Sequence, residues 1–207
     1  MKTIKVRMTL IESMLGTSPN DEDIFVNFVG SKAPNAETRA QEVEALGADA
    51  VVEKGMTVFP RSADGEPILW DYQIKGFFKD SCSMLARVKN NGGKKLYKSA
   101  GIKAYKKVID GMVFPAPREI VIHLPDGEEI DYCQRPLRAQ TAQGERVALA
   151  ISERVPAGSW FEFEVVCLDD DHIDLVKEWL DYAKLRGFGQ WRNSGCGRAT
   201  YEILEEG

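Results

Sequence analysis

The sequence predicts an α+β fold, and two observations lead to that prediction. Residues Lys2–Leu10 alternate apolar and polar side chains, as in a strand with one face buried. Near the other end, residues 160–204 contain in turn an alternating segment, an amphipathic helix, a glycine-rich loop and a second alternating segment. Such a strand–helix–strand unit is one half of a ferredoxin-like fold. With 207 residues and 43% hydrophobic content, the chain can bury a substantial core as a single domain over 1–207.

An acidic insertion is predicted to follow the first strand. Between Glu12 and Glu53 there are nine acidic and two basic residues, and prolines and glycines interrupt the segment. Apolar spacing predicts short helices over Asp21–Gly30 and Ala36–Leu46. A strand is expected over Val51–Pro60. We therefore interpret residues 12–53 as an insertion between the first strand and the rest of the core.

A helix is predicted from Ile74 to Val88, inside a strongly basic stretch. Between Gln73 and Lys107 there are ten Lys or Arg residues and one acid. This stretch therefore carries +9 and the rest of the chain −14, which together give the net charge of −5. A basic patch on an acidic body is typical of a surface that contacts polyanions. The alternative is an ordinary solvated surface.

We predict a basic arm over residues 89–111, after this helix. Tyr97 and Tyr105 lie among its lysines. A tyrosine beside lysines can stack on a nucleobase while the ammonium groups hold phosphates. Equally, both tyrosines can anchor the arm to the core.

The middle of the chain is predicted to contain a β-hairpin. Its strands are Val113–Leu124 and Ile130–Cys133, on either side of a Pro-Asp-Gly turn. A polar loop, Gln140–Arg146, is expected before a further strand over Val147–Ile151. Several polar side chains of this region suit contacts with a nucleic-acid backbone or base edges, and equally suit an ordinary hairpin tip: Arg135, Arg138, Gln140 and Gln143.

The C-terminal strand–helix–strand unit has clear boundaries. Trp160–Leu168 alternates like a half-buried strand. Three aspartates, 169–171, then supply carboxylates for the positive end of a helix, whose apolar residues recur at spacings of three and four up to Ala183. Gly187 is expected to end this helix as its C′ residue, and Ala199–Leu204 forms the last predicted strand.

The loop between that helix and the last strand has the composition of a phosphate-binding loop. Residues 186–198 carry two Gly-x-Gly pairs, three arginines and a tryptophan. Glycine lets backbone N–H groups approach a phosphodiester, and arginine supplies a fixed fork of donors. No carboxylate follows Arg192 and Arg198 before Glu202, so we expect both arginines to face a ligand. Trp191 is expected either to stack on a base or to fill a gap under the loop.

The segment Gly187-Phe-Gly-Gln-Trp-Arg-Asn-Ser-Gly-Cys-Gly-Arg198 resembles the C-terminal glycine-rich signature of the RAMP superfamily of CRISPR-associated RNA-binding proteins, particularly its guide-coating backbone subunits. Glu153–Phe161 is similar to the segment that these subunits carry just before the strand that leads into their final helix. Asp64–Lys79 is similar to their motif in which a Lys-Gly pair opens the first helix, although the usual Pro-Gly-Ser-Ser is absent. The resemblance covers residues 58–88 and 135–204.

The resemblance implies a modified ferredoxin-like or RNA-recognition (RAMP-like) α+β fold with an acidic insertion and a basic arm. It implies binding of single-stranded RNA or DNA, head-to-tail self-association along the strand and contact with CRISPR effector subunits. A free-standing relative in a phage or mobile element fits the same resemblance. The implied nucleic-acid-binding residues are Lys75, Gly76, Lys79, Lys94, Lys95, Arg138, Gly187, Gly189, Gln190, Trp191, Arg192, Gly195, Gly197 and Arg198.

Three other functions remain open from the sequence. One is a metal-dependent endoribonuclease, for which Asp21, Asp23 and Asp49 are candidate ligands but nothing selects among them. The others are a mimic that blocks a CRISPR complex, and a binder of small cyclic nucleotides. His123 falls in a strand and His172 opens the last helix, so neither is favoured as a general base. We therefore expect a non-catalytic protein that needs no metal or cofactor.

The cysteines and the hydropathy of the sequence indicate in which cellular compartment the protein is expected. Four cysteines are scattered without a Cys-x-x-Cys pair, which argues against a zinc site and a disulfide framework. No apolar run approaches the ~20 residues that span a bilayer. The N-terminus alternates like a strand, unlike a signal peptide. A cytoplasmic protein without membrane contact is expected.

Overall fold

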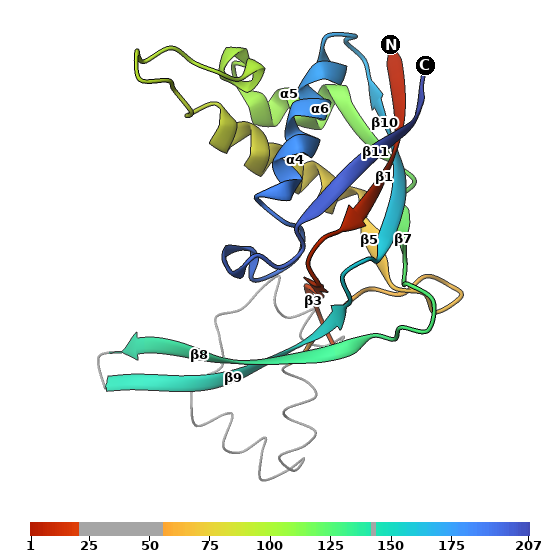
Figure 1. Cartoon of the computed structure of the whole chain (residues 1–207), viewed down its shortest axis with the longest axis vertical. Helices are drawn as coiled ribbons and strands as arrows, with labels where there is room; N and C mark the ends of the chain where they lie inside the picture. The colour runs from red at the N-terminus through yellow and green to blue at the C-terminus, as the bar shows by residue number, and fades with distance from the viewer. Residues whose placement is uncertain (21–55, 142–143) are drawn as a thin grey trace.

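An antiparallel sheet with helices on one face forms the centre of the structure (Figure 1). The computed structural model describes residues 1–20, 56–141 and 144–207, with side chains outside 137–149. The strand order is β11-β1-β10-β7-β5, and β6 also pairs with β10. The bounds are β1 Lys2–Leu10, β5 Ile68–Trp70, β6 Val113–Ala116, β7 Glu119–His123, β10 Trp160–Cys167 and β11 Ala199–Glu206.

The central strands β1 and β10 explain why this sheet has one buried face. Ile4, Val6 and Met8 of β1 are fully buried, and the residues between them are not. The same alternation holds on β10, where Phe161 and Phe163 point into the core. These alternating strands confirm the prediction of an α+β fold and the bounds predicted for the first strand.

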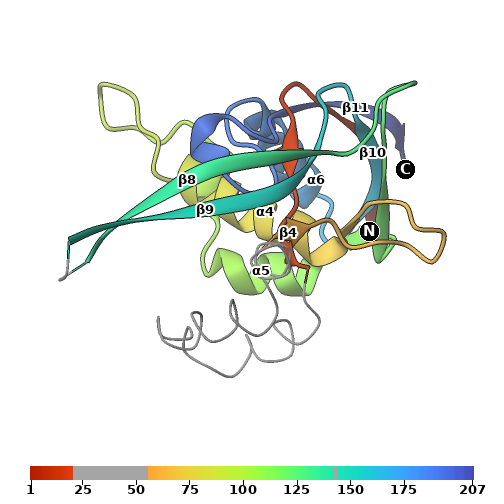
Figure 2. The same ribbon diagram turned by 90° about the horizontal axis from the view of Figure 1, so that it is seen from below.

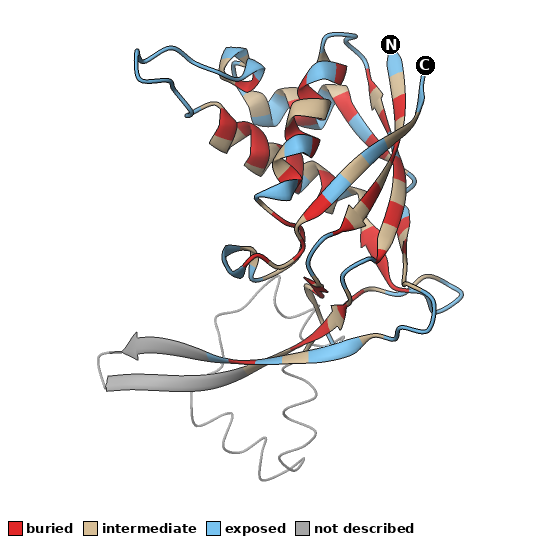
Figure 3. Cartoon of the chain, viewed as in Figure 1, coloured by how far each residue is buried: buried red, intermediate tan, exposed pale blue. Residues whose placement is uncertain are grey.

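Three helices cover the buried face: α4 Asp71–Leu85, α5 Tyr105–Met112 and α6 His172–Asp181. Buried residues of these helices and of the sheet belong to one hydrophobic core. Figure 3 shows buried positions on both layers. Trp179 of α6 is fully buried and its ring lies 5.4 Å from that of Phe78 on α4. The core is therefore made by the sheet, α4 and α6 together.

A second sheet lies at the lower end of the first in Figure 1 and carries a long hairpin. Strands β8 Asp131–Thr141 and β9 Gly144–Val155 pair along their whole length, from Asp131 opposite Arg154 to Thr141 opposite Gly144. The hairpin lies below the helices in Figure 1 and runs across them in the view from below in Figure 2. Short strands join β9 at its foot: β2 Met14–Leu15, β4 Thr57–Val58 and, beyond β4, β3 Ser18–Pro19.

The predicted hairpin over 113–133 is wrong. β7 pairs with β5 and β10, whereas β8 pairs with β9 in the other sheet. The polar loop predicted over Gln140–Arg146 is too long, because Gln140 and Thr141 belong to β8 and Gly144–Arg146 to β9. These residues lie at the end of a hairpin, which is the alternative that their composition also fitted. A two-stranded ribbon that projects from the core needs no apolar alternation, so its polar sequence indicated a loop.

Helix α4 begins three residues before the predicted start at Ile74. The Gln73 Oε1 accepts a hydrogen bond of 2.8 Å from the Trp70 backbone N–H, which fixes the first turn. The Lys75-Gly76 pair therefore lies within the helix and does not open it, contrary to the expectation from the resemblance. Gly76 is exposed on the helix surface.

The basic segment after α4 is tied to α6 at one point. Lys98–Gly101 form a short 3-10 helix, and Glu178 of α6 accepts hydrogen bonds from the backbone N–H groups of Lys98 (2.7 Å) and Ser99 (3.0 Å). The Ser99 hydroxyl in turn accepts one from Trp179 Nε1 at 2.9 Å. Tyr105 packs against the core, as one of the two alternatives expected. Tyr97 is 39% exposed, and its stacking on a nucleobase stays a prediction.

The extents of the predicted insertion and arm stay predictions. Most of the insertion lies outside the described residues, including both predicted helices and the aspartates considered as metal ligands. Of the predicted strand Val51–Pro60, the structure describes β4 alone.

Candidate nucleic-acid interface

The glycine-rich loop, residues 186–198, is folded tightly against the core and against β2. The Phe188 backbone N–H donates to Gly197 O at 2.9 Å, and the Gly197 N–H donates to Ser13 O at 2.8 Å. The buried Phe188 ring lies 4.2 Å from the ring of Phe77 on α4 and 5.6 Å from that of Phe161 on β10. The loop therefore has a fixed path before any ligand binds.

Two of its glycines are required because the loop crosses itself. A Cβ on Gly187 would lie 2.2 Å from Cys196 O, and a Cβ on Gly197 would lie 2.1 Å from Phe188 O. Gly187 does not have a positive φ, so the predicted left-handed cap at this residue is wrong. The space beside these glycines is filled by the protein's own backbone.

The other two glycines differ from each other. Gly189 has φ +74, and its Cβ would lie 2.5 Å from Leu15 O on β2. Gly195 has φ +92, and its Cβ would meet the flexible guanidinium of Arg198 at 3.5 Å. Gly195 is thus needed for its backbone conformation, whereas Gly189 also permits close packing on β2.

Arg192 has a carboxylate partner that its neighbours in sequence do not reveal. Arg192 Nη1 and Arg186 Nε each donate to Asp80 Oδ2 of α4 at 2.9 Å. Arg186 Nη1 also donates to Asn193 Oδ1 at 2.9 Å. The expectation that Arg192 lacks a carboxylate is wrong, because Asp80 lies 112 positions away and reaches the loop through the packing of α4 beneath it.

Arg198, unlike Arg192, has a guanidinium nitrogen without a hydrogen-bond partner in the described part of the chain. This atom is Nε, which is buried. The Arg198 backbone O accepts hydrogen bonds from the N–H groups of Ile11 (2.7 Å) and Glu12 (3.3 Å), which fix its position.

Trp191 presents a ring at the surface of the loop. The ring is 46% exposed, and the residue has a left-handed backbone with φ 53. The guanidinium of Arg135, at the foot of the β8–β9 hairpin, lies 5.3 Å from the ring centroid. Gln190 Oε1 accepts from Arg135 Nη2 at 2.7 Å, and Gln190 Nε2 donates to Gly16 O at 2.9 Å. Gln190 therefore positions Arg135, and its amide is already occupied.

The predicted lysines on α4 face another part of the molecule. Lys75 Nζ donates to Asp110 O of α5 at 3.2 Å and lies 4.5 Å from the Phe114 ring centroid. Lys79 Nζ forms an ion pair of 2.5 Å with Asp110 Oδ1. Both ammonium groups are engaged with α5, whereas Asp80 of the same helix is engaged with the loop.

The remaining predicted residues lie further along the basic segment and on the hairpin. Lys94 is exposed, and its backbone N–H donates to Asn90 Oδ1 at 2.9 Å. Lys95 Nζ donates to Ala86 O. Arg138 lies in β8 opposite Val147, and its side chain is outside the described residues. The structure thus brings together the loop residues, Asp80 and Arg135, but not the lysines.

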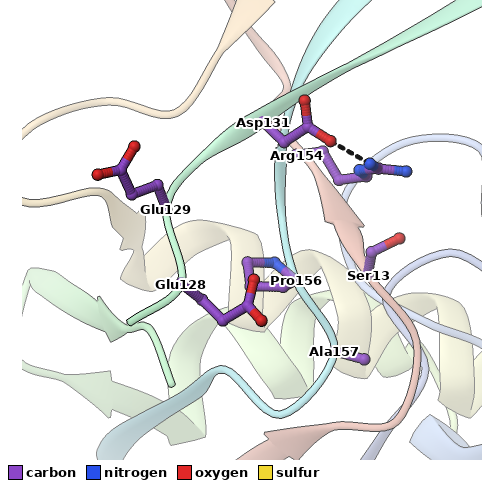
Figure 4. A pocket seen from close by; sticks show the side chains of 7 residues that line it. All are labelled: Ser13, Glu128, Glu129, Asp131, Arg154, Pro156 and Ala157. Carbon is purple, nitrogen blue, oxygen red and sulfur yellow. Dashed lines mark hydrogen bonds and ion pairs between the residues drawn. The ribbon is translucent and has the colours of Figure 1, made fainter. Parts of the chain in front are cut away.

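A pocket of about 250 Å³ lies between the foot of the hairpin and the residue before β2 (Figure 4). Its lining is acidic, and its one arginine, Arg154, is paired with Asp131. The backbone N–H of Tyr132 and then Arg154 lower the pKa of Asp131. This charge disfavours a polyanion, so a nucleic acid is not expected here. The lining residues are Ser13, Glu128, Glu129, Asp131, Arg154, Pro156 and Ala157.

In the ranges 1–20, 56–141 and 144–207, His, Cys, Asp and Glu form no cluster able to hold a metal. His123 stacks on Trp160 with ring centroids 4.0 Å apart.

All four cysteines are free thiols. Burial raises the pKa of the Cys196 thiol, and the neighbouring Cys133 raises it further. No helix in the described ranges has the length and apolar content to cross a membrane.

Comparison with known proteins gives a likeness in fold. No family model matches the sequence, and no curated protein matches it. A chain in the cryo-EM structure of the type III-B Cmr-beta bound to cognate target RNA is similar, with a TM-score of 0.51 and 8% sequence identity. The match covers 100% of this chain and 60% of that chain. This distant structural neighbour supports the resemblance drawn from the glycine-rich loop at the level of fold.

Asp80→Asn is expected to loosen the loop. The change removes the charge that two arginines share in a partly buried site, so we expect a loss of about 1–2 kcal/mol of unfolding free energy. Trypsin should then cut faster after Arg186 and Arg192. Asp181→Asn, in an exposed pair with Lys184, is the matched control and should change neither measurement. Equal trypsin rates in the two variants would show that Asp80 does not hold the loop.

Proposed function

We propose that this chain binds a single strand of nucleic acid, RNA or DNA, across the glycine-rich loop and the foot of the β8–β9 hairpin. The observation that carries the proposal is Trp191. A bulky residue with φ 53 is strained by about 1–3 kcal/mol, and such strain persists where function requires it. Here the strained backbone holds a large aromatic ring at the surface, where a nucleobase can stack on it.

The charges around the ring support the same proposal. Arg135 lies against Trp191, and Arg198 lies against Gly195 of the same loop. Arginine donors beside an aromatic ring can hold phosphates while a base stacks. The exposed lysines of the basic segment add an electrostatic attraction for the rest of the strand.

The fold supports a RAMP-like protein within this proposal. With the additional β5 and α5 set aside, the elements in chain order are β1, α4, β6 with β7, β10, α6 and β11. The corresponding sheet order is β11-β1-β10-β7, antiparallel throughout. This is the order of a ferredoxin-like sheet, into which the β8–β9 hairpin is inserted. The structural neighbour belongs to a structure bound to target RNA. Head-to-tail self-association and contact with CRISPR effector subunits stay predictions.

Binding of labelled single-stranded RNA and DNA to the purified protein tests the proposal. We expect affinity to fall with salt, with a log–log slope of about −0.7 per phosphate neutralised. Trp191→Ala should weaken binding by about 1–3 kcal/mol, because one stacked base is lost, and Trp191→Phe should retain most of the affinity. Leu185→Ala, which removes an exposed apolar side chain just before the loop, is the control and should bind normally.

Two results would contradict the proposal. One is a flat salt response with either strand. The other is normal binding by Trp191→Ala, which would place any nucleic-acid site elsewhere on the molecule.

A further inference from the structure

Arg135 is a buried cation whose hydrogen-bonding capacity is incompletely used. Its side chain is 8% exposed, and it is fixed on β8 opposite Ala150 of β9. Nη2 donates to Gln190, but Nη1 is buried and has no acceptor in the described part of the chain. A buried N–H without a partner is rare and unfavourable, and a buried charge without one is more so.

Three carboxylates of the hairpin and of α4 are engaged by other arginines. Asp131 is paired with Arg154, Glu153 with Arg61, and Asp80 with two arginines of the loop. Arg135 differs from those arginines, because its Nη1 has no hydrogen-bond partner in the described part of the chain. It is a positive donor that lies beside the glycine-rich loop.

A second unused donor lies on the same loop. Arg198 Nε is buried without an acceptor among the described residues, and the Arg198 guanidinium lies against Gly195. The Trp191 ring covers the Arg135 guanidinium at 5.3 Å while remaining 46% exposed.

We propose that Arg135 Nη1 forms a binding site for one phosphate group beneath Trp191, reached when the Trp191 ring turns toward solvent. The site rests on the proposed function in one respect: in a bound strand, the base next to this phosphate stacks on Trp191. A phosphate offers the buried guanidinium a charged acceptor, which a water or hydroxyl does not. Gln190 is then a positioning residue, since it holds Arg135 through Nη2.

Arg135→Gln tests the site, with thermal unfolding in chloride and in pyrophosphate at equal ionic strength as one measurement. For the wild type we expect pyrophosphate to raise Tm, because it binds the folded state. In the variant this rise should disappear, while Tm in chloride should stay the same or increase, because a buried unpaired charge is removed. Arg118→Gln removes an exposed arginine and should keep the full rise.

Binding of single-stranded RNA is the second measurement on the same variants. Arg135→Gln should lower affinity by about ten- to hundredfold, as expected for one charge-assisted hydrogen-bonded contact. Its log–log salt slope should be smaller by about 0.7, the contribution of one phosphate. Arg135→Lys keeps the charge without the planar fork and should give an intermediate affinity.

The two measurements separate this site from the proposed function. A pyrophosphate effect that Arg135→Gln abolishes, with no RNA binding by the wild type, would support a site for free phosphates and reject the strand. RNA binding by the wild type that Arg135→Gln leaves unchanged would reject the site and keep the proposed function. A variant that unfolds at a much lower Tm in chloride would show that Arg135 is a structural brace, and would also overturn the site.

Discussion

Gly197→Ala is expected to lose about 3–5 kcal/mol of unfolding free energy, the largest effect of any single methyl group in the loop. A Cβ at this residue would lie 2.1 Å from Phe188 O and 2.7 Å from Phe188 N. Those atoms belong to backbone that the buried Phe188 ring holds in place, so they cannot move aside cheaply. The residue also has φ +73, which adds the cost of a left-handed alanine. Urea unfolding monitored by circular dichroism measures the change.

Gly195→Ala is the matched control for this prediction. Gly195 has φ +92 in the same loop, but the nearest atoms to its Cβ belong to the flexible side chain of Arg198. It should therefore show the conformational cost alone, about 1–2 kcal/mol. If both variants lost the same free energy, the loop would not be as closely packed as Gly197 indicates.

Glu153→Ala is expected to lose about 2–4 kcal/mol of unfolding free energy. The side chain is 5% exposed, and its carboxylate accepts hydrogen bonds from the Phe59 N–H at 2.8 Å and from Arg61 Nη2 at 2.5 Å. Alanine would leave a buried backbone N–H without a partner at the junction of β9 and β4. The loss is limited because Arg61 is partly exposed and can turn to solvent.

Two further variants separate the contributions at this junction. Glu153→Gln keeps an acceptor for Phe59 and loses the charge, so its stability should lie between that of Glu153→Ala and the wild type. Asp131→Asn breaks an exposed pair on the same hairpin and should change stability little. A cost for Glu153→Ala no larger than that of Asp131→Asn would contradict the role assigned to the buried carboxylate.

The elements that the sequence predicted well are those whose side chains face the core on one side only. β1, β10 and β11 lie at or within one or two residues of their predicted ends, because Ile4, Phe161 and their neighbours alternate between core and surface. The strand predicted over Val147–Ile151 lies within β9, but the pairing of β8 with β9 was not predicted, because two separate strands carry no local signal of which strand pairs with which.

The glycine-rich loop was predicted as a loop, but its contacts were not. The glycine-rich loop was found from its composition, yet its glycines serve packing on Phe188 and Leu15, which composition does not show. The contact of Asp80 with Arg192 spans 112 positions and that of Arg135 with Gln190 spans 55. Such contacts depend on how α4 and the hairpin are placed, and no local pattern marks them.

The shared carboxylate of Asp80 also has a consequence for the entropy of binding. Because Arg186 and Arg192 meet at one oxygen, the chain between them is closed into a small ring by noncovalent bonds. Closing a ring restricts the conformations of everything inside it, and here that restriction is imposed when the protein folds. A strand that docks on Trp191 would therefore meet a surface that is already ordered, and little of its binding free energy would be spent on ordering the loop.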